Sequence, residues 1–469
     1  MEYRIEKDLL GEIKIPCNVY WGIHTQRALN NFTVSRYKVP FALIKSIATV
    51  KKACCETNSE LGYLDTTLAA AIMKAAGEIE QGDFRDEFPI DAMQGGAGTS
   101  TNMNVNEVIA NRALEIIGCK KGEYSKCHPI EHVNLHQSTN DVYPTALKIA
   151  CIKGMRELSK SIALLQGAFQ KKEKKYSDTI IIGRTELQEA VPITMGAQFS
   201  SFAEAIARDR WRTFKCEERL RVVNLGGTAV GTGLTAPRRY IFLVNEKIRT
   251  LTGYGITRGE NLLDQTANTD VFVEVSGILD AHSANLIKIS NDLRLLHLLG
   301  EIKLASVQAG STIMPGKVNP VICESVISAC LKVSANHAVV TNAVSRGSLQ
   351  INEFIPVIGF AILESIEFLI NTSRMLSKHI NVCAIAAHRC ELNVNSSTAC
   401  VTALVPHIGY KNAEKIVKGF EASDLNDFRQ YLSESLGKDF IDSILTPEAF
   451  MSLGYREKEI MKKKPRKDS

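Results

Sequence analysis

A run of residues between positions 310 and 320 combines side chains that could do chemistry with residues that bend the chain. It reads Gly-Ser-Thr-Ile-Met-Pro-Gly-Lys-Val-Asn-Pro. Glycines at its start and middle permit backbone conformations that are closed to other residues, and a proline between them stiffens the chain locally. Ser311 and Thr312 offer hydroxyl groups, Lys317 offers a positive charge for an anion, and Asn319 offers an amide. The run therefore predicts a mobile loop that closes over an anionic ligand.

Three further segments concentrate small hydroxyl, amide and charged side chains. They are Thr-Ser-Thr-Asn-Met-Asn at 99–104, His-Gln-Ser-Thr-Asn-Asp at 136–141 and Gly-Arg-Thr-Glu-Leu-Gln at 183–188. A single run of this kind usually caps a helix or forms a turn. Together the segments fit a ligand with many acceptor oxygens, because a carboxylate is held best by several neutral donors and one or two cations. They predict a site for a small dicarboxylate.

Long helices are expected to position these segments. Apolar residues recur at intervals of 3, 4 or 7 in two stretches, one at Val275, Leu279, Leu286, Ile289, Leu293 and Leu296 and the other at Ile362, Ile366, Leu369 and Leu376. Such spacing places the apolar residues on one face of a helix. Proline and glycine are sparse in 146–180 and 268–299, which favours helices longer than average and a helix bundle. We predict a mainly α fold with three domains: a mixed, mostly helical domain at 1–140, a central long-helix bundle at 141–390 and a small helical domain at 391–469.

Composition describes a globular chain of 469 residues, 45% hydrophobic and 23% charged, with a formal net charge of +5. Much of this excess lies in the tail 462–467, so the rest is close to neutral. A short terminal charge run is usually solvated, and we expect no nucleic-acid partner. The chain shows no signal peptide and no 18-residue uninterrupted apolar stretch, so we expect a cytoplasmic protein without a membrane partner.

Metal, disulfide and nucleotide sites are not indicated. The twelve cysteines lack paired CxxC spacing, which favours reduced thiols, and we find no metal signature. The glycine clusters at 95–98 and 226–233 have neither the GxGxxG order nor the GK[ST] ending of phosphate-binding loops.

The 310–320 run resembles the signature of the aspartase/fumarase superfamily, whose members add or remove a small group beta to a carboxylate. The likeness extends from Arg4 to about Pro447. Several segments resemble the aspartase branch, namely Trp-Gly-Ile-His-Thr at 21–25 and the segments 96–100, 188–192, 268–277 and 349–352. The resemblance implies a three-domain subunit, a homotetramer with active sites shared by three subunits, and no required cofactor. The implied reaction is the reversible anti elimination of ammonia from L-aspartate to give fumarate.

That reaction takes a proton from the carbon next to a carboxylate and creates a dianionic aci-carboxylate. The resemblance makes Ser311 the base. Because the pKa of a free serine is far too high for this task, its alkoxide must be stabilised by loop amides and neighbouring positive charge. Loss of one donor to an oxyanion commonly costs about 3 to 4 kcal/mol, so several donors around one carboxylate supply much of the acceleration.

The resemblance also assigns the substrate-binding residues. Those that hold the β-carboxylate are Thr101, Ser138, Thr139 and Thr312. Lys317 and Asn319 grip the α-carboxylate. Asn140 and Thr185 lie beside the amino group that leaves as ammonia.

Two departures from the family pattern bear on the substrate. Glu186 stands where the superfamily commonly has His or Gln, and if it lies near Glu324, one of these two carboxyl groups should hold a proton at neutral pH. The segment 297–300 lacks a Ser-Gly-Pro-Arg run that relatives usually have. Three alternatives therefore stay open: a fumarate hydratase, a divergent lyase that acts on a substituted aspartate, and a scaffold that has lost catalysis.

Overall fold

The computed structural model describes residues 2–455, and the basic tail at 462–467 lies outside the described residues. Helices dominate the described part of the chain, which confirms the mainly α fold. Its strands form four two-stranded pairs. These are β1 (Tyr3–Asp8) with β2 (Gly11–Pro16), β3 (Ile180–Thr185) with β4 (Gln188–Thr194), β5 (Val222–Val223) with β6 (Thr257–Arg258), and β7 (Ile302–Lys303) with β8 (Ala384–Ile385).

The chain divides into two compact units, each made of three segments. Unit 1 contains Met1–Lys160, Trp211–Ser283 and Ala329–Ile370, and unit 2 contains Ser161–Arg210, Ala284–Ser328 and Asn371–Ser469. The boundaries fall within five long helices, α5 (Thr139–Lys175), α6 (Met195–Leu220), α9 (Val271–Leu298), α10 (Val321–Val344) and α11 (Ile355–Val382). The consecutive domains at 1–140, 141–390 and 391–469 stay a prediction.

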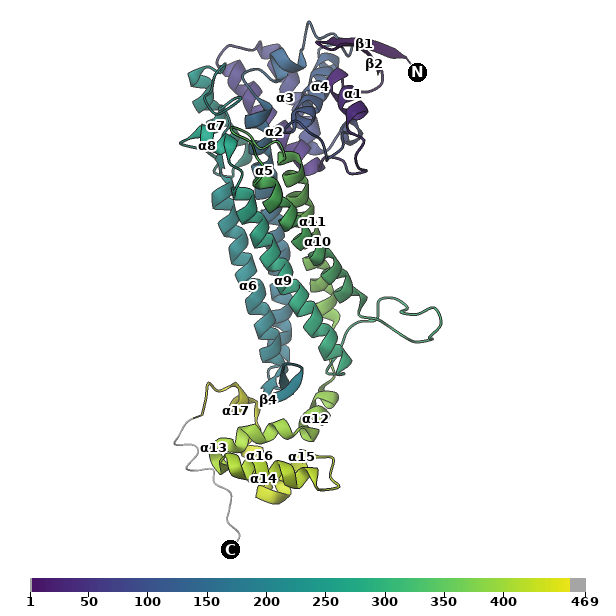
Figure 1. Ribbon diagram of the computed structural model, residues 1–469, viewed down its shortest axis with the longest axis vertical. Helices are drawn as coiled ribbons and strands as arrows, with labels where there is room; N and C mark the ends of the chain where they lie inside the picture. The colour runs from purple at the N-terminus through teal and green to yellow at the C-terminus, as the bar shows by residue number, and fades with distance from the viewer. Residues whose placement is uncertain (1, 456–469) are drawn as a thin grey trace. The chain divides into compact units, whose positions relative to one another are not determined.

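Besides its portions of the five long helices, unit 1 contains several shorter helices (Figure 1). They are α1 (Ile23–Asn31), α2 (Phe41–Glu60), α3 (Thr66–Gln81), a short helix at Arg85–Glu87, α4 (Thr99–Ile116), a π-helical turn at Pro129–Val133, α7 (Arg238–Thr252) and α8 (Leu262–Ala267). Helix α3 begins at Asp65, whose carboxylate accepts N–H bonds from Thr67 and Leu68, and ends at Gly82 with φ +122°. These are ordinary helix start and stop signals.

Unit 2 ends in a group of small helices packed around a core of its own. They are α12 (Ala387–Ser396), a 3-10 helix at Thr398–Leu404, α13 (Val405–Ile408), α14 (Tyr410–Glu421), α15 (Phe428–Leu436), α16 (Lys438–Ile444) and α17 (Pro447–Met451). Leu404, Phe428, Leu432 and Ile441 are fully buried at the centre of this group, and Ile182 of β3 belongs to the same core. The β3–β4 hairpin is thereby anchored to the C-terminal helices of its unit.

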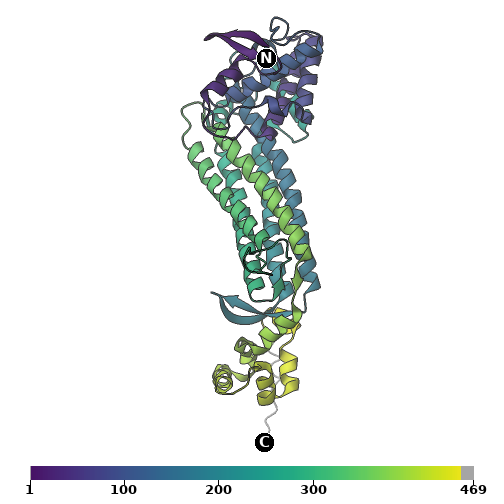
Figure 2. The same cartoon turned by 90° about the vertical axis from the view of Figure 1, so that its right-hand side faces the viewer.

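The apolar stripes predicted from the sequence are buried. All ten of their residues are at most 8% exposed. In unit 1, α5 lies directly against α11, since a side chain at Gly154 would approach within 2.8 Å of Ile366. In unit 2, Phe169 of α5 packs against Phe199 and Phe202 of α6. Within each unit the long helices run side by side (Figures 1 and 2), and this packing rather than intrinsic propensity stabilises helices of such length.

Helix α11 is the one described helix that is long and apolar enough to cross a membrane. Of its most apolar 18-residue window, 61% is buried inside the structure, as expected for a helix packed within a protein. Glu364 and Glu367 interrupt its apolar sequence.

Candidate active site

The 310–320 run forms a loop between β7 and α10 in unit 2, without regular secondary structure. Figure 1 shows it standing away from the adjoining ends of α9 and α10. Two hydrogen bonds close its base: the Gly310 N–H donates to Lys317 O at 2.8 Å, and Asn319 Nδ2 donates to Gly310 O at 3.0 Å. A Cβ at position 310 would lie 2.8 Å from the Asn319 nitrogen, so only glycine fits there.

Ser311 is held by amides of its own loop. Its Oγ accepts N–H bonds from Met314 at 2.9 Å and from Ile313 at 3.2 Å. Backbone N–H groups aimed at an oxygen favour a negative charge on it, and they need no reorganisation when that charge develops. These two amides would favour negative charge on Ser311 Oγ, and the role of Ser311 as the base stays a prediction.

The loop is open to water on much of its surface. Ile313 is 84% exposed and Met314 48% exposed, and Lys317 and Thr312 are exposed as well. The loop borders an open hollow of about 510 Å³ that is lined by Ser311, Lys317 and neighbouring loop residues. Water weakens every electrostatic interaction at such a place. Catalysis by Ser311 therefore requires another surface to cover the loop.

Unit 1 brings the segments 99–104 and 136–141 together at the beginnings of α4 and α5. Asn102 Nδ2 donates to Thr139 Oγ1 at 3.1 Å and thereby joins the two helix starts. The N-terminus of a helix favours anions because its N–H groups are unpaired and its dipole is positive. Ser138 caps α5, since its Oγ accepts the Asn140 N–H at 3.2 Å. As acceptors in these bonds, the Ser138 and Thr139 hydroxyl groups keep a hydrogen to donate to a carboxylate.

Thr101 and Asn140 are already engaged. Thr101 is 1% exposed, and its hydroxyl donates to Gln94 Oε1 at 2.8 Å, so it can donate to a ligand only by leaving Gln94. Asn140 Nδ2 donates to Ala229 O at 2.7 Å in the glycine-rich segment 226–233. Asp141 accepts N–H bonds from Gly226 and Thr228 in that same segment. The glycine-rich segment therefore supports the start of α5.

Lys51 of α2 is fully buried beside the 136–141 segment. Its Nζ donates to Asn134 Oδ1 and to Gln137 Oε1, both at 2.8 Å. Asn134 Oδ1 also accepts a bond from Asn102 Nδ2 at 3.1 Å, and Asn102 bonds Thr139 as described above. Burial lowers the pKa of Lys51 to about 7. One buried lysine side chain thus organises the amides that hold the two helix starts in place.

We expect Lys51→Met to change how thermal stability depends on pH. The usual pKa of lysine is 10.5, whereas that of folded Lys51 is about 7. Between these values the unfolded chain binds one more proton than the folded protein, so stability rises with pH. The methionine variant lacks this increase. The melting temperature of the wild type minus that of the variant should therefore grow between pH 7 and pH 9.

The matched control is Lys52→Met, which removes the neighbouring lysine whose ammonium lies 2.7 Å from Glu80 on the partly exposed side of α2. Its melting temperature should stay parallel to that of the wild type over the same pH range. A wild-type advantage over Lys51→Met that is constant with pH would contradict the lowered pKa.

Thr185 and Glu186 lie at the tip of the β3–β4 hairpin in unit 2, and both are exposed. Glu324 lies in the first turn of α10 and is half-buried. Among the described residues no hydrogen bond or ion pair joins Glu186 to Glu324. A proton shared between Glu186 and Glu324 stays a prediction, because it needs a contact between the two carboxyl groups and no such bond is present among the described residues.

Other features of the described residues lie apart from these segments. A cavity of about 1240 Å³ in unit 1, beside Phe41, Lys45 and Phe360, contains none of the candidate residues. All twelve cysteines are free. Within residues 2–455 no group of three or more His, Cys, Asp or Glu side chains is arranged to hold a metal ion.

Comparison with known proteins places the whole arrangement in a family. A family model described as lyase matches residues 11–335. The chain belongs to this lyase family. The superfamily membership expected from the 310–320 run is thereby confirmed.

Curated members of the lyase family resemble this chain over nearly its full length. An aspartate ammonia-lyase from Bacillus sp is 42% identical over 89% of this chain and 90% of its own. An aspartate ammonia-lyase from Escherichia coli (strain K12) is 40% identical over 97% of each chain. Among solved structures, a fumarate lyase:delta crystallin from Brucella melitensis bound to cobalt has a TM-score of 0.91 at 41% identity, covering 96% of this chain and 100% of that one. A class II fumarase from Schistosoma mansoni has a TM-score of 0.89 at 31% identity, covering 97% and 100%.

Two charged residues of this lyase escaped the sequence analysis. Lys51 stands among Ile47, Val50 and Cys54 on the buried face of α2, and Glu301 stands between Leu299 and Ile302. A charged residue on an apolar face was the available signal, because such a residue is buried only when it is paired or hydrogen-bonded. What it pairs with depends on distant parts of the chain.

Proposed function

We propose that this chain is an aspartate ammonia-lyase that catalyses the reversible anti elimination of ammonia from L-aspartate to give fumarate through an aci-carboxylate intermediate. The curated relatives with that activity are 40–43% identical over most of the chain and support a carbon–nitrogen lyase. The structural observation that carries the chemistry is the pair of loop amides on Ser311 Oγ.

In this proposal Ser311 removes the Cβ proton while its loop amides stabilise the charge on Oγ. Ser138, Thr139 and Thr312 donate hydrogen bonds to the β-carboxylate, where negative charge accumulates, and Thr101 joins them when its hydroxyl leaves Gln94. The free hydroxyl hydrogens of Ser138 and Thr139 at the start of α5 support this role. Several such donors stabilise the intermediate more than the substrate, which lowers the barrier.

The remaining residues orient the substrate. Lys317 and Asn319 grip the α-carboxylate, with the Asn319 bond to Gly310 O keeping the base of the loop closed. Asn140, Thr185 and Glu186 lie beside the amino group, and Glu324 is proposed to lie behind them without touching the substrate. Holding both carboxylates aligns the Cβ proton with the base, which is the main requirement for an elimination.

We infer that the active enzyme is a homotetramer in which each site combines segments from three subunits. Two observations support this. The candidate loop exposes Ile313 and Met314, which need a covering surface. Helix α10 exposes the large apolar side chains of Leu331 and Val339, which another subunit could cover. We expect the tetramer to act in the cytoplasm without a required cofactor and without nucleic-acid or membrane partners.

One assay tests the proposed reaction. Purified protein is mixed with L-aspartate and, separately, with L-malate, and fumarate absorbance is followed. We expect fumarate from aspartate. If the protein forms fumarate from malate but not from aspartate, it is a fumarate hydratase and the proposal is wrong. If neither compound gives fumarate, a lyase for a substituted aspartate or a scaffold without catalysis is favoured.

We expect Glu186→Gln to retain or increase activity with L-aspartate. Glu186 is exposed, and no bond within the described residues holds its carboxylate. Removing its charge reduces repulsion of the substrate carboxylates, an effect of about 0 to 1 kcal/mol at an exposed site and so at most about fivefold in kcat/KM. The control is Glu391→Gln on the exposed face of α12. Complete loss of activity would show that Glu186 has an essential role.

A further inference from the structure

The tip of the β3–β4 hairpin has a backbone that needs outside support. Thr185 pairs with Gln188, and the two residues between them, Glu186 and Leu187, have φ of +51° and +63°. This left-handed region suits glycine and asparagine, and other side chains occupy it only where the surrounding structure holds them. The tip therefore keeps its shape because of contacts made elsewhere on the hairpin.

Arg184, next to the tip, makes the strongest of these contacts. Its Nη2 donates to Glu301 Oε1 at 2.8 Å, and its Nη1 donates to Glu301 Oε2 at 3.2 Å and to Ile182 O at 2.9 Å. A two-point guanidinium–carboxylate pair fixes orientation as well as distance. The strand pairing also shifts register between Gly183 and Arg184, a bulge of the kind that redirects side chains beside functional sites.

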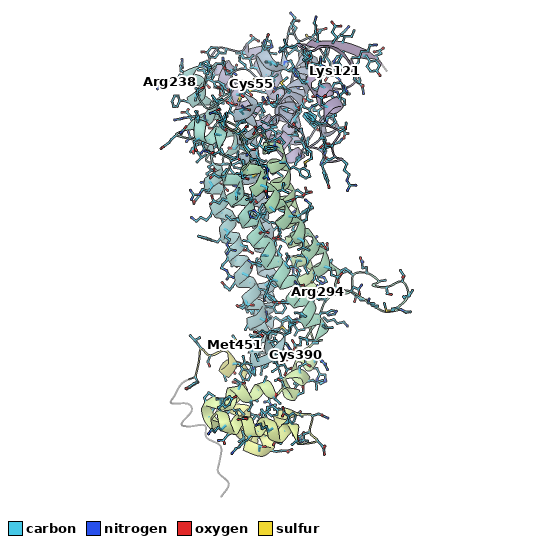
Figure 3. The ribbon with its side chains drawn as sticks, in the orientation of Figure 1. Cys55, Lys121, Arg238, Arg294, Cys390 and Met451 are labelled. Atoms are coloured by element: carbon cyan, nitrogen blue, oxygen red, sulfur yellow. The ribbon has the colours of Figure 1, made fainter. Side chains whose placement is uncertain are left out.

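Glu301 is itself immobilised. Its side chain is 0% exposed, and its Oε1 accepts a further bond from Asn393 Nδ2 of α12 at 3.1 Å. Its backbone oxygen accepts bonds from the Ala386 N–H at 3.0 Å and from the thiol of Cys390, which is labelled in Figure 3. It directly follows the 297–300 segment. Arg184 thus binds a buried carboxylate, and three other residues hold the glutamate that carries it.

We propose that the Arg184–Glu301 pair is the positioning device for the hairpin tip and sets how the site binds the amine. The pair acts through Thr185 and Glu186 and does not touch the substrate. Its effect on the amine rests on the proposed function, which places these two residues beside the leaving ammonia. Its effect on the shape of the hairpin follows from the contacts of Arg184 and Glu301 and does not depend on the proposed function.

The test variant is Glu301→Gln, which keeps the side-chain shape and leaves the Arg184 charge without its counter-ion. The matched control is Glu217→Gln, because Glu217 accepts a similar two-point bond from Arg156 at 2.9 and 2.7 Å in unit 1. Breaking a buried pair destabilises a protein, so both variants should melt at lower temperature. Arg184→Lys, which keeps the charge but loses the two-point geometry, serves as a milder second variant if Glu301→Gln does not fold.

Hydrogen exchange provides the first readout. In Glu301→Gln the amides of β3 and β4 should exchange about tenfold faster than in the wild type, because the hairpin opens more often once its anchor is lost. The control should leave these amides unchanged. Unchanged exchange of the hairpin in a folded Glu301→Gln or Arg184→Lys variant would overturn the proposal.

The reverse reaction, fumarate plus ammonia, provides the second readout. In Glu301→Gln we expect the KM for ammonia to rise about tenfold and the KM for fumarate less than about threefold, because only the amine side loses its alignment. If the KM for ammonia and the KM for fumarate rise equally, the Arg184–Glu301 pair has a purely structural role. That result would overturn the proposal that the pair positions the residues beside the amine. A wild type that is inactive with aspartate and with fumarate plus ammonia would refute the proposed function, and the exchange measurement would still decide whether the pair holds the tip.

Discussion

Replacing Ser311 with alanine is expected to lower turnover of L-aspartate by about 10²- to 10⁴-fold, the range that a positioned general base usually contributes. The variant loses the only atom that could take the Cβ proton from this position. Folding should survive, because the Ile313 and Met314 amides that lose their acceptor lie in a loop open to water. The measurement is kcat from fumarate absorbance, together with the mass of the assembly in solution.

Ser328→Ala is the matched control for Ser311→Ala. Ser328 is an exposed serine of α10 whose hydroxyl bonds only the Glu324 carbonyl of its own helix. It should leave turnover unchanged. If Ser311→Ala forms an intact assembly and keeps near-normal turnover, Ser311 is not the base.

Lys317→Met should lower kcat/KM for L-aspartate by about 10- to 100-fold. A hydrogen bond to a charged partner contributes about 1.5 to 3 kcal/mol, and the methionine cannot make the proposed bond to the α-carboxylate. The loop should keep its shape, because the contact that closes its base uses the backbone oxygen of Lys317 and not its side chain. The measurement is steady-state kinetics with aspartate.

Lys303→Met serves as the control for Lys317→Met, since Lys303 is exposed in β7 of the same unit and belongs to no candidate segment. It changes the net charge equally and should leave kcat/KM within about twofold of the wild type, as surface charges away from a site usually do. Equal losses in both variants would mean that general attraction of the anion, rather than a specific bond, accounts for the effect.

Local patterns allowed much of the fold to be predicted. The spacing of Leu279, Leu286 and Leu293 indicated a buried helix face, and all three are buried. The composition of 310–320 indicated a loop, and Gly310 does lie where no side chain fits. Helix faces and tight loops depend mainly on residues a few positions apart, so they can be read from the order of residues.

The candidate site was predictable only in part, because its supporting contacts join distant residues. The sequence shows that Thr139 has a hydroxyl group that can donate a hydrogen bond. The Asn102 amide that orients this hydroxyl belongs to another helix, so the contact is visible only in the structure. The Ser311 base was inferred from the chemistry and the family signature, whereas the two amides on its Oγ belong to the folded loop.

The sequence by itself determined the helical class and the membership of the lyase family, and it predicted the donor, cation and base side chains. The tertiary structure alone decided which charges are buried and what they hold: Lys51 beneath the starts of α4 and α5, and Glu301 beneath the hairpin tip. The physical reason is that burying a charge costs free energy unless partners surround it, and those partners are brought together only by folding. Residue type and spacing can therefore supply the chemistry of the site, while long-range packing supplies its geometry.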